Sequence, residues 1–363
     1  MPLPSRPRVP GPTRRMLIPA AVALVVVMVA AGCGVGSTPQ PTGPGAATSP
    51  APSSSPPAEP TELVVGLGYI PSVQFAQFYL ADQAGYYEAA GLDVTFQNQI
   101  DPDLIRLVGQ GSVDLALADG TSLVPAASQG IPVRYVATIY ARFPNVVFAD
   151  AASGIRTVAD LTGRRIGIPG RFGSGWIMLQ AILGSAGLAP EDVTIVEYPD
   201  FGQLIGVQQG AVDAATGFVN NEPVVLELEG GDPVLLRVDD IVPLPGNGLI
   251  TGDSTAAAKP DAVRAFIAAT LRAMEEIIAD PEVGLEATIT AVPEFASDRD
   301  KLRAILQATI ETWQSPLTDA EGLGAIDPAA WAATIDYLET LEGDLVPNPV
   351  TVEDLISTDY LPE

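Results

Sequence analysis

Reactive side chains are scarce in this 363-residue sequence, and their scarcity excludes most covalent chemistry. There is no histidine, one cysteine at Cys33, and two lysines, Lys259 and Lys301. After Cys33 the chain therefore cannot form His/Cys metal sites, Ser-His-Asp triads, Cys-His pairs or disulfides. A Schiff base would have to use one of the two lysines, and carboxylate catalysis is open but not required by any motif. The residue types favour binding over catalysis, and we expect no cofactor.

Two candidate binding segments lie in the first half of the chain, each between an expected strand and an expected helix. This edge of an α/β sheet is where ligands bind. After the first strand, Tyr69 or Phe75 could stack on a flat ring, with Gln74 beside them, although Phe75 could instead belong to the core. At a later junction, Asp119 could accept a ligand hydrogen bond, and Thr121 could contact the ligand or cap the helix.

A third candidate segment, residues 170–175, is rich in glycine and contains Arg171, Phe172 and Ser174. Glycines expose backbone N–H groups, and a helix N-terminus attracts anions. A phosphate, sulfonate or carboxylate could bind here. The alternative is an ordinary tight turn between a strand and a helix.

The fourth candidate segment closes a later strand with Phe218, Asn220, Asn221 and Glu222. Amide and carboxylate side chains can pair with the donor and acceptor edges of a heterocyclic ring. Because a proline follows Glu222, the alternative is a helix start. Arg142 is expected at a crossing between lobes, where it could reach the ligand or brace the crossing.

Alternating strand and helix patterns must position these segments. Strand patterns at residues 63–68 and 92–96 flank a helical pattern at 74–84, which predicts an α/β fold with largely parallel strands. Residues 110–116 (QGSVDLA) return as residues 209–215 (QGAVDAA), each after a helical pattern. We interpret this repeat as two similar lobes, the alternative being a chance echo of a common turn.

The expected organisation is two lobes with an interlobe cleft, built from three stretches of chain. We expect residues 61–150 to begin lobe 1, residues 151–246 to form lobe 2, and residues 247–363 to return to lobe 1 with C-terminal helices. The return contains an amphipathic pattern over residues 260–280, which predicts a long helix.

The first 60 residues have the composition of an export leader and a tether. A basic pair precedes the apolar residues 16–32 and Cys33, a pattern similar to bacterial lipoprotein signals. We expect residues 1–32 to be a signal peptide, Cys33 to be lipidated, and residues 33–60 to be a disordered Pro/Ser/Gly tether. The alternatives are a transmembrane anchor and twin-arginine export. Each of these places the rest of the chain outside the cytoplasmic membrane.

The charge of the chain excludes one class of partner. The formal net charge is −26, and the few Lys and Arg residues are not clustered. Nucleic-acid binding needs clustered positive side chains, so no nucleic acid is expected.

Several motifs resemble those of solute-binding proteins of ABC importers in the alkanesulfonate and thiamine-pyrimidine-precursor group. They are residues 69–72 (YIPS), 84–94 (AGYYEAAGLDV), 110–114 (QGSVD), 129–133 (QGIPV), 154–167 (GIRTVADLTGRRIG), 209–214 (QGAVDA) and 221–223 (NEP). The resemblance implies the type II periplasmic-binding-protein fold, with two α/β lobes joined by a two-strand hinge that close on a ligand.

Within that group, residues 69–79 and 220–223 are most similar to the branch that binds vitamin-type aromatic heterocycles, including riboflavin-binding and formylaminopyrimidine-binding proteins. The resemblance implies a small heterocyclic ligand, an ABC permease as partner, a monomeric chain and lipid anchoring on the extracytoplasmic side. Tyr69 and Phe75, without a nearby histidine, favour riboflavin over a thiamine-pyrimidine precursor.

Three rival functions stay open. The first is a sulfonate, nitrate or taurine receptor that uses residues 170–175. The second is an enzyme similar to thiamine-pyrimidine synthases, which share the fold but use a histidine and a cysteine cluster that this chain lacks. The third is a structural or sensory lipoprotein without a soluble ligand.

Overall fold

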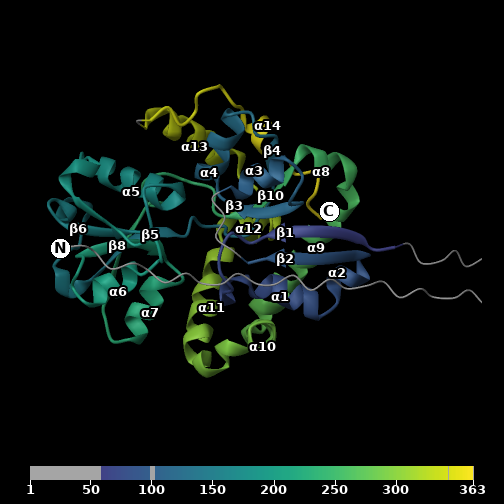
Figure 1. Cartoon of the computed structure of the whole chain (residues 1–363), viewed down its shortest axis with the longest axis horizontal. Helices are drawn as coiled ribbons and strands as arrows, with labels where there is room; N and C mark the ends of the chain where they lie inside the picture. The colour runs from purple at the N-terminus through teal and green to yellow at the C-terminus, as the bar shows by residue number, and fades with distance from the viewer. Residues whose placement is uncertain (1–58, 99–102, 342, 363) are drawn as a thin grey trace, which may run out of the picture. The chain divides into compact units, whose positions relative to one another are not determined.

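The computed structural model describes residues 59–98, 103–341 and 343–362, and the described body contains two mixed β-sheets (Figure 1). The first sheet has the strand order β2-β1-β3-β10-β4, and the second has the order β7-β6-β8-β5-β9. In each sheet, three parallel strands are followed by two antiparallel pairings. The predicted α/β class is confirmed, with one antiparallel strand inserted in each sheet.

The strands are short, and their bounds follow the two sheets. The first sheet consists of β1 (Thr61–Gly66), β2 (Leu92–Gln97), β3 (Leu115–Ala118), β4 (Val133–Thr138) and β10 (Gly248–Gly252). The second sheet consists of β5 (Asn145–Asp150), β6 (Arg165–Ile168), β7 (Thr194–Glu197), β8 (Ala214–Phe218) and β9 (Pro233–Arg237).

Helices follow most strands and cover the sheets. In the first part of the chain they are α1 (Ala76–Gln83), α2 (Tyr86–Ala89), α3 (Leu104–Gly109) and α4 (Gly120–Ser128). Those among the strands of the second sheet are α5 (Gly173–Ser185), α6 (Gln203–Gln208) and α7 (Glu222–Leu228). After β10 come α8 (Asp253–Ala258), α9 (Pro260–Ala279), α10 (Pro281–Ala291), α11 (Arg299–Trp313), α12 (Pro316–Glu321), α13 (Pro328–Thr340) and α14 (Val352–Leu355). Short 3-10 helices span Val73–Phe75, Ala151–Ser153, Val158–Leu161, Pro190–Asp192 and Pro293–Asp298.

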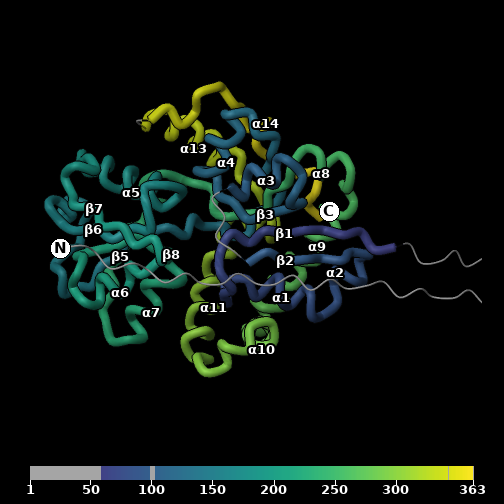
Figure 2. The backbone as a smooth tube through the Cα atoms, viewed as in Figure 1, coloured from purple at the N-terminus to yellow at the C-terminus, as the bar shows by residue number. Residues whose placement is uncertain are grey.

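The chain starts in the first sheet, crosses to the second and then returns, as the colour change along the tube shows (Figure 2). We call the first sheet with its helices lobe 1 and the second sheet with its helices lobe 2. The strand β5 pairs with β8 and β9, so it belongs to lobe 2. The sequence prediction, which extended lobe 1 to residue 150, had placed this strand in lobe 1.

The core of lobe 1 is aromatic because the amphipathic helix α9 inserts Phe266 between two other rings. The Phe266 ring stacks on Tyr87 with centroids 4.9 Å apart, and on Phe78 with centroids 6.2 Å apart. The predicted helix at residues 260–280 is therefore present as α9, and its apolar side is buried in this core.

The repeated motif has the same structural role in both lobes. Asp114 exchanges two hydrogen bonds with Val64, since the Val64 N–H donates to its carboxylate (2.9 Å) and its own N–H donates to the Val64 carbonyl (2.8 Å). Asp213 does the same with Arg165, at 2.9 Å for each bond. The glycines before them, Gly111 and Gly210, have φ of 73° and 67°, which favours glycine. The echo in the sequence therefore reflects a repeated junction.

Two connections run between the sheets, from β4 to β5 and from β9 to β10. The N–H groups of Ile139 and Tyr140 both donate to the carbonyl oxygen of Asn247, at 3.1 and 2.8 Å. Next to it, Gly246 passes so close to the first connection that a Cβ there would lie 2.0 Å from the Tyr140 carbonyl oxygen. The two connections are thus bonded to each other at Asn247.

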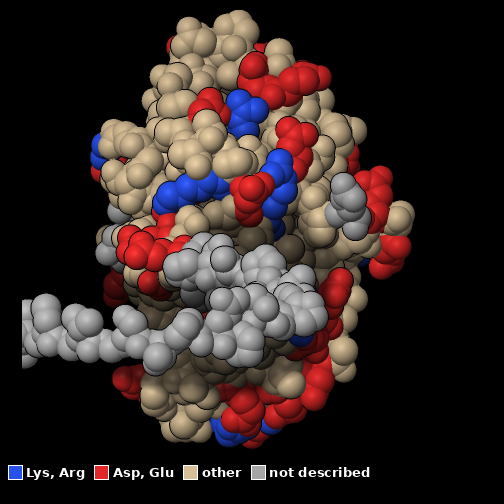
Figure 3. Space-filling view, turned by 90° about the vertical axis from the view of Figure 1, so that its right-hand side faces the viewer, with Lys and Arg blue, Asp and Glu red and all other residues tan. Residues whose placement is uncertain are grey.

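Surface charges are spread rather than gathered into a basic patch on the face in Figure 3, where Asp and Glu outnumber Lys and Arg.

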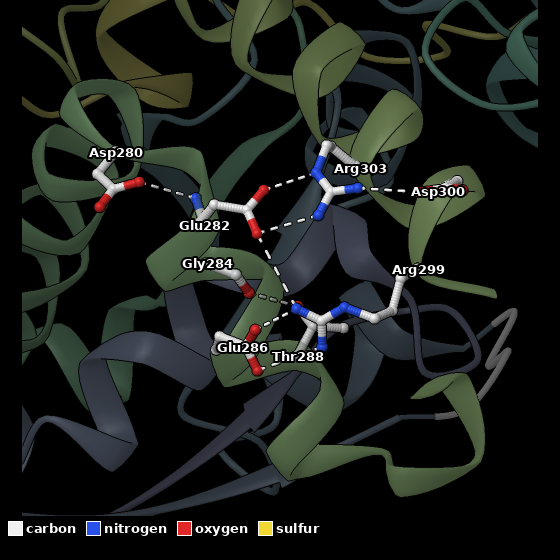
Figure 4. Close-up of polar contacts among 8 residues, drawn as sticks. All are labelled: Asp280, Glu282, Gly284, Glu286, Thr288, Arg299, Asp300 and Arg303. Atoms are coloured by element: carbon white, nitrogen blue, oxygen red, sulfur yellow. Dashed lines mark hydrogen bonds and ion pairs between the residues drawn. The ribbon is translucent and has the colours of Figure 1, made fainter. Parts of the chain in front are cut away.

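The clearest ion-pair network joins α10 to α11 (Figure 4). Arg303 binds Glu282 through two nitrogens, at 2.6 and 3.1 Å, and Arg299 pairs with Glu286. These arginines lower the pKa of both glutamates, but all four side chains are exposed and therefore screened by solvent.

Candidate ligand-binding site

The predicted segments lie where the chain leaves the carboxyl ends of strands, and the structure joins two of them across the lobes. Tyr69, which follows β1 in lobe 1, meets lobe 2 at Phe201, with ring centroids 5.6 Å apart and an edge-to-face angle of 76°. Burial, with a smaller contribution from the charge of Glu222, raises the pKa of Tyr69 to about 12. The predicted residues Tyr69 and Glu222 are therefore neighbours in the structure.

A second contact between the lobes joins two other predicted residues. The Asn220 Nδ2 atom, just after β8, donates to Gln74 Oε1 at 3.1 Å and to Thr309 Oγ1 in α11 at 2.8 Å. All three side chains are buried. Segments from residues 74, 220 and 309 thus meet at one buried polar junction.

Glu222 is held at the end of β8 by local hydrogen bonds. It is the first residue of α7, so the predicted helix start is confirmed. Its carboxylate accepts from the Phe218 N–H at 2.9 Å and from Gln203 Nε2 at 3.4 Å. Asn221 forms the N-cap without a capping side-chain bond. Burial raises the pKa of Glu222 because the surroundings disfavour its charged form.

Asp119 in lobe 1 caps its own helix. One carboxylate oxygen accepts from Thr121 Oγ1 and from the Ser122 N–H (3.1 Å), and the other accepts from Ser122 Oγ (3.2 Å). Burial raises the pKa of this carboxyl, against the opposing effect of these bonds. The helix is capped by Asp119 itself, not by Thr121 as the sequence interpretation had it, and both carboxylate oxygens of Asp119 already accept hydrogen bonds.

Phe75 is buried in the core of lobe 1, where its ring lies 6.5 Å from that of Phe78. This agrees with the alternative that placed it in the core. Arg142 lies on the first connection, and its backbone N–H donates to the Thr312 carbonyl at 3.2 Å. It lines a cavity of about 420 Å³ together with Pro245 and Trp331. This cavity is bordered by both connections, and none of the other predicted binding residues lines it.

A second cavity, of about 440 Å³, lies between α1 and α10. Its lining includes Leu80 and Ala287, along with Glu282 and Glu286 of the ion-pair network. None of the predicted binding residues lines it.

The glycine-rich segment at residues 170–175 leads into α5, as predicted. Arg171 is exposed, lies 3.4 Å from Glu197 and stacks over Trp176 at 5.3 Å. The ring of Phe172 is 59% exposed. Ser174 Oγ accepts from Asn145 Nδ2 at 3.3 Å. The only cationic side chain of this segment is thus already engaged by a carboxylate and a ring.

Two buried amides at this edge were not predicted from the sequence. Asn145, the first residue of β5, pairs in register with Phe218 and is 3% exposed. Gln203, the first residue of α6, donates from Nε2 to the Thr216 carbonyl at 3.2 Å. Gln203 lies at a strand–helix junction, so the same rule could have found it. Asn145 could not be found this way, because it begins a strand instead of following one.

Cys33, the predicted lipidation site, lies outside the described residues. In the part of the chain that the structure describes, no helix has the length and apolarity needed to cross a membrane. Over the same residues, no group of three or more acidic or cysteine side chains is arranged to hold a metal ion.

Comparison with known proteins gives several related sequences. The riboflavin-binding protein RibY of Chloroflexus aurantiacus is 34% identical over 86% of this chain and 90% of its own length. The formylaminopyrimidine-binding protein of Halalkalibacterium halodurans is 28% identical over 81% of this chain and 89% of its own length. A 4-amino-5-hydroxymethyl-2-methylpyrimidine phosphate synthase of Legionella pneumophila is 28% identical, over 60% of this chain and 69% of its own length.

Solved structures establish the fold. The alkanesulfonate-binding protein SsuA of Xanthomonas axonopodis pv. citri, bound to MOPS, has a TM-score of 0.63 and 22% identity, covering 83% of this chain and 99% of its own. A Candida albicans protein described as having the generic periplasmic binding protein fold has a TM-score of 0.59 and 17% identity, covering 82% and 96%. The NMT1/THI5-like family model matches residues 72–283. The two-lobed fold is that of periplasmic binding proteins, and the chain belongs to the NMT1/THI5-like family.

Proposed function

We propose that this chain is an extracytoplasmic solute-binding protein of an ABC importer that binds riboflavin or a related vitamin-type heterocycle between its lobes. The observation that supports this most strongly is Tyr69 of lobe 1 lying against Phe201 of lobe 2, beside Glu222. Separation of the lobes would part the two rings, and a flat ligand ring would then lie between them. Relatives that bind riboflavin and formylaminopyrimidine support the same ligand class.

A binding function fits the residues better than the synthase activity of some relatives. Lys259, one of the two lysines, has its Nζ bonded to Asp114 Oδ1 and to the Glu62 carbonyl, both at 2.9 Å. Asp114 directly precedes β3, so this ammonium lies at the amino end of the sheet, opposite the candidate site. Lys259 is therefore not placed to react with a ligand at the carboxyl edge. Lys301 is exposed on α11.

The anion receptor has weaker support. An anion at residues 170–175 would need the N-terminus of α5 and the Arg171 guanidinium. That guanidinium is exposed to solvent and already pairs with Glu197. The alternative predicts that MOPS, the ligand in the related SsuA structure, competes with any bound heterocycle.

We further propose that Cys33 is lipidated after removal of residues 1–32, and that residues 33–60 tether a monomeric body to the outer side of the membrane. There it would deliver its ligand to an ABC permease. The expected mass spectrum of the membrane-extracted chain has a diacylated or triacylated cysteine as its first residue. An intact Met1 terminus in the membrane would contradict the anchor without affecting the ligand proposal.

The ligand proposal is tested by titrating the full chain with riboflavin and recording flavin fluorescence. Stacking against aromatic rings is expected to quench the flavin, with micromolar or tighter affinity. Replacement Tyr69→Ala removes a stacking ring and should weaken binding about tenfold, which corresponds to about 1.4 kcal/mol. Tyr360→Ala is the matched control, since Tyr360 packs on Arg264 at 5.6 Å and not at the site. Failure to bind riboflavin or an aminopyrimidine, together with binding of MOPS, would favour the anion receptor.

A further inference from the structure

Three buried amide oxygens at the carboxyl edge of lobe 2 have no hydrogen-bond donor: Asn145 Oδ1, Gln203 Oε1 and Asn220 Oδ1. The Asn145 amide faces the Ser174 hydroxyl, which can donate or accept, so its orientation is not fixed. The Gln203 and Asn220 side chains are 1% and 0% exposed. A buried acceptor without a donor costs about 1–3 kcal/mol, and such groups are rare in native proteins. Gln203 Oε1 therefore calls for a partner that its described neighbours do not supply. The Tyr140 hydroxyl lies beside the Asn220 side chain, so a ligand donor at Asn220 Oδ1 would compete with that hydroxyl.

The orientation of the Gln203 and Asn220 amides is determined by their neighbours, so the free atom is the oxygen in both. Gln203 Nε2 faces the Thr216 carbonyl oxygen at 3.2 Å, and a carbonyl can only accept. Asn220 Nδ2 faces Thr309 Oγ1 at 2.8 Å, and Thr309 already donates its proton to the Ile305 carbonyl at 2.8 Å. Rotating either amide by 180° would place an oxygen against an acceptor.

The surroundings add the Glu222 carboxyl and no cation. Glu222 accepts a hydrogen bond from Gln203 Nε2 and follows Asn220 by two residues in the sequence. Within residues 59–98, 103–341 and 343–362, no lysine or arginine donates a hydrogen bond to Gln203, Asn220 or Glu222. A negatively charged ligand group would meet acceptors and a carboxyl here, whereas an N–H group would meet its complement.

We propose that Gln203 and Asn220 are specificity-determining residues whose side-chain oxygens accept hydrogen bonds from ring N–H, amino or hydroxyl groups of the ligand. The site thereby selects an uncharged, donor-bearing heterocycle edge and rejects sulfonates and carboxylates. This inference rests on the proposed function, since it assigns the ligand chemistry of the same cleft. Neither residue contributes through charge, so the selection comes from the penalty of leaving its oxygen unpaired when the ligand lacks a donor.

The test compares riboflavin with 3-methylriboflavin, in which a methyl group replaces the ring N3–H donor. For the full chain we expect riboflavin to bind at least tenfold more tightly. Gln203→Met and Asn220→Leu each remove one acceptor. In at least one of these variants the preference for riboflavin should fall below threefold, because the lost donor no longer has a buried partner. MOPS is expected not to compete in any of them.

The matched control is Gln208→Met, which changes an exposed glutamine of the same helix whose Nε2 bonds to Glu229. It should keep the tenfold preference. If riboflavin binds but the native chain does not discriminate against the methylated compound, the inference is overturned while the proposed function stands. The same holds if both variants keep the native preference. If a variant fails to fold, the affinities of the native chain for riboflavin and 3-methylriboflavin still test the inference. Absence of binding to riboflavin and to 4-amino-5-hydroxymethyl-2-methylpyrimidine would overturn the proposed function and this inference with it.

Discussion

Lobes 1 and 2 share one strand order, yet their carboxyl edges differ in how their polar groups are used. In lobe 1, both carboxylate oxygens of Asp119 accept hydrogen bonds from Thr121 and Ser122 of the helix that it caps. In lobe 2, Gln203 and Asn220 each keep a buried oxygen without a donor. The same topology therefore carries edges whose polar groups are used differently, although Gln77 of α1 in lobe 1 is also a buried amide without a partner. We place the ligand-selecting groups on the edge of lobe 2.

The amino ends of the two sheets differ in a similar way. Asp114 and Asp213 both hydrogen-bond to the backbone of the neighbouring strand, but the basic side chains that pair with them come from different parts of the chain. Asp114 pairs with Lys259, which lies between α8 and α9 in the return segment, whereas Asp213 pairs with Arg165 of the adjacent strand at 2.8 Å. Lobe 1 therefore uses this junction to fasten its two separate stretches of chain, while lobe 2 uses it only locally.

The largest expected effect is a difference in how much stability the two junctions lose when their aspartates are replaced. Asp114→Ala should lower the free energy of unfolding by about 3 kcal/mol, since it leaves the Val64 N–H and the Lys259 ammonium without their acceptor. Asp213→Ala should cost less, about 1–2 kcal/mol, because Arg165 can turn to solvent. Urea unfolding measures both, with the exposed Asp261→Ala as a control that changes little. Equal losses at the two junctions would refute the fastening role of Asp114.

The next effect tests whether the edge of lobe 1 is structural. Asp119→Ala removes a helix N-cap and should cost about 1–2 kcal/mol of stability, with riboflavin affinity unchanged within twofold. Asp327→Ala is the matched control, since Asp327 caps α13 through the Ala329 and Ala330 N–H groups. A selective loss of affinity in the Asp119 variant would instead assign its carboxylate to the ligand.

A smaller effect concerns pH and the edge of lobe 2. Burial raises the pKa of Glu222, so the unfolded chain loses this proton at a lower pH than the folded chain. Stability therefore falls as pH rises from the ordinary glutamate range through the raised pKa. Glu222→Gln lacks this titration, and the stability of the native chain relative to the variant should decrease between pH 4 and pH 8. A constant difference over urea titrations in that range would show that Glu222 titrates normally. Asp119, present in both proteins, cancels in the comparison.

The smallest effect is expected at the glycine-rich segment. Phe172 is exposed and Arg171 pairs only at the surface, so Arg171→Ala and Phe172→Ala should each change stability by less than about 0.5 kcal/mol. Riboflavin affinity, measured by fluorescence titration, should change less than twofold. A tenfold loss in either variant would extend the binding edge to this segment.

The sequence allowed the two lobes and most of the edge to be predicted, because those features depend on local patterns. The repeated Gly and Asp of the two junctions are visible as letters, and the rule for strand ends places Tyr69, Asp119 and Glu222. The position of Asn145 depends on β5 running antiparallel to β8, which is a tertiary pairing that no local pattern encodes. For the same reason β5 was assigned to the wrong lobe.

The contacts between lobes were also beyond prediction. Nothing in the spacing of Tyr69 and Phe201, or of Asn220 and Thr309, indicates that these residues meet. Such pairs arise from how two separate sheets are oriented, and the sequence carries that information only through many small packing preferences. The orientation of the Gln203 and Asn220 amides could not be predicted either, because it depends on which hydrogen-bond partners the fold brings next to them.

The bonding of both connections to Asn247 has a mechanical consequence. The Asn247 carbonyl oxygen accepts hydrogen bonds from the Ile139 and Tyr140 N–H groups, so this one atom links the two connections between the lobes. Any large swing must either twist the peptide planes around this atom or pull these amides away from it. The rate of amide hydrogen exchange at Ile139 and Tyr140 would then report the movement of the lobes. Exchange is expected to be faster in the ligand-free protein and slower when a bound ligand keeps the lobes closed.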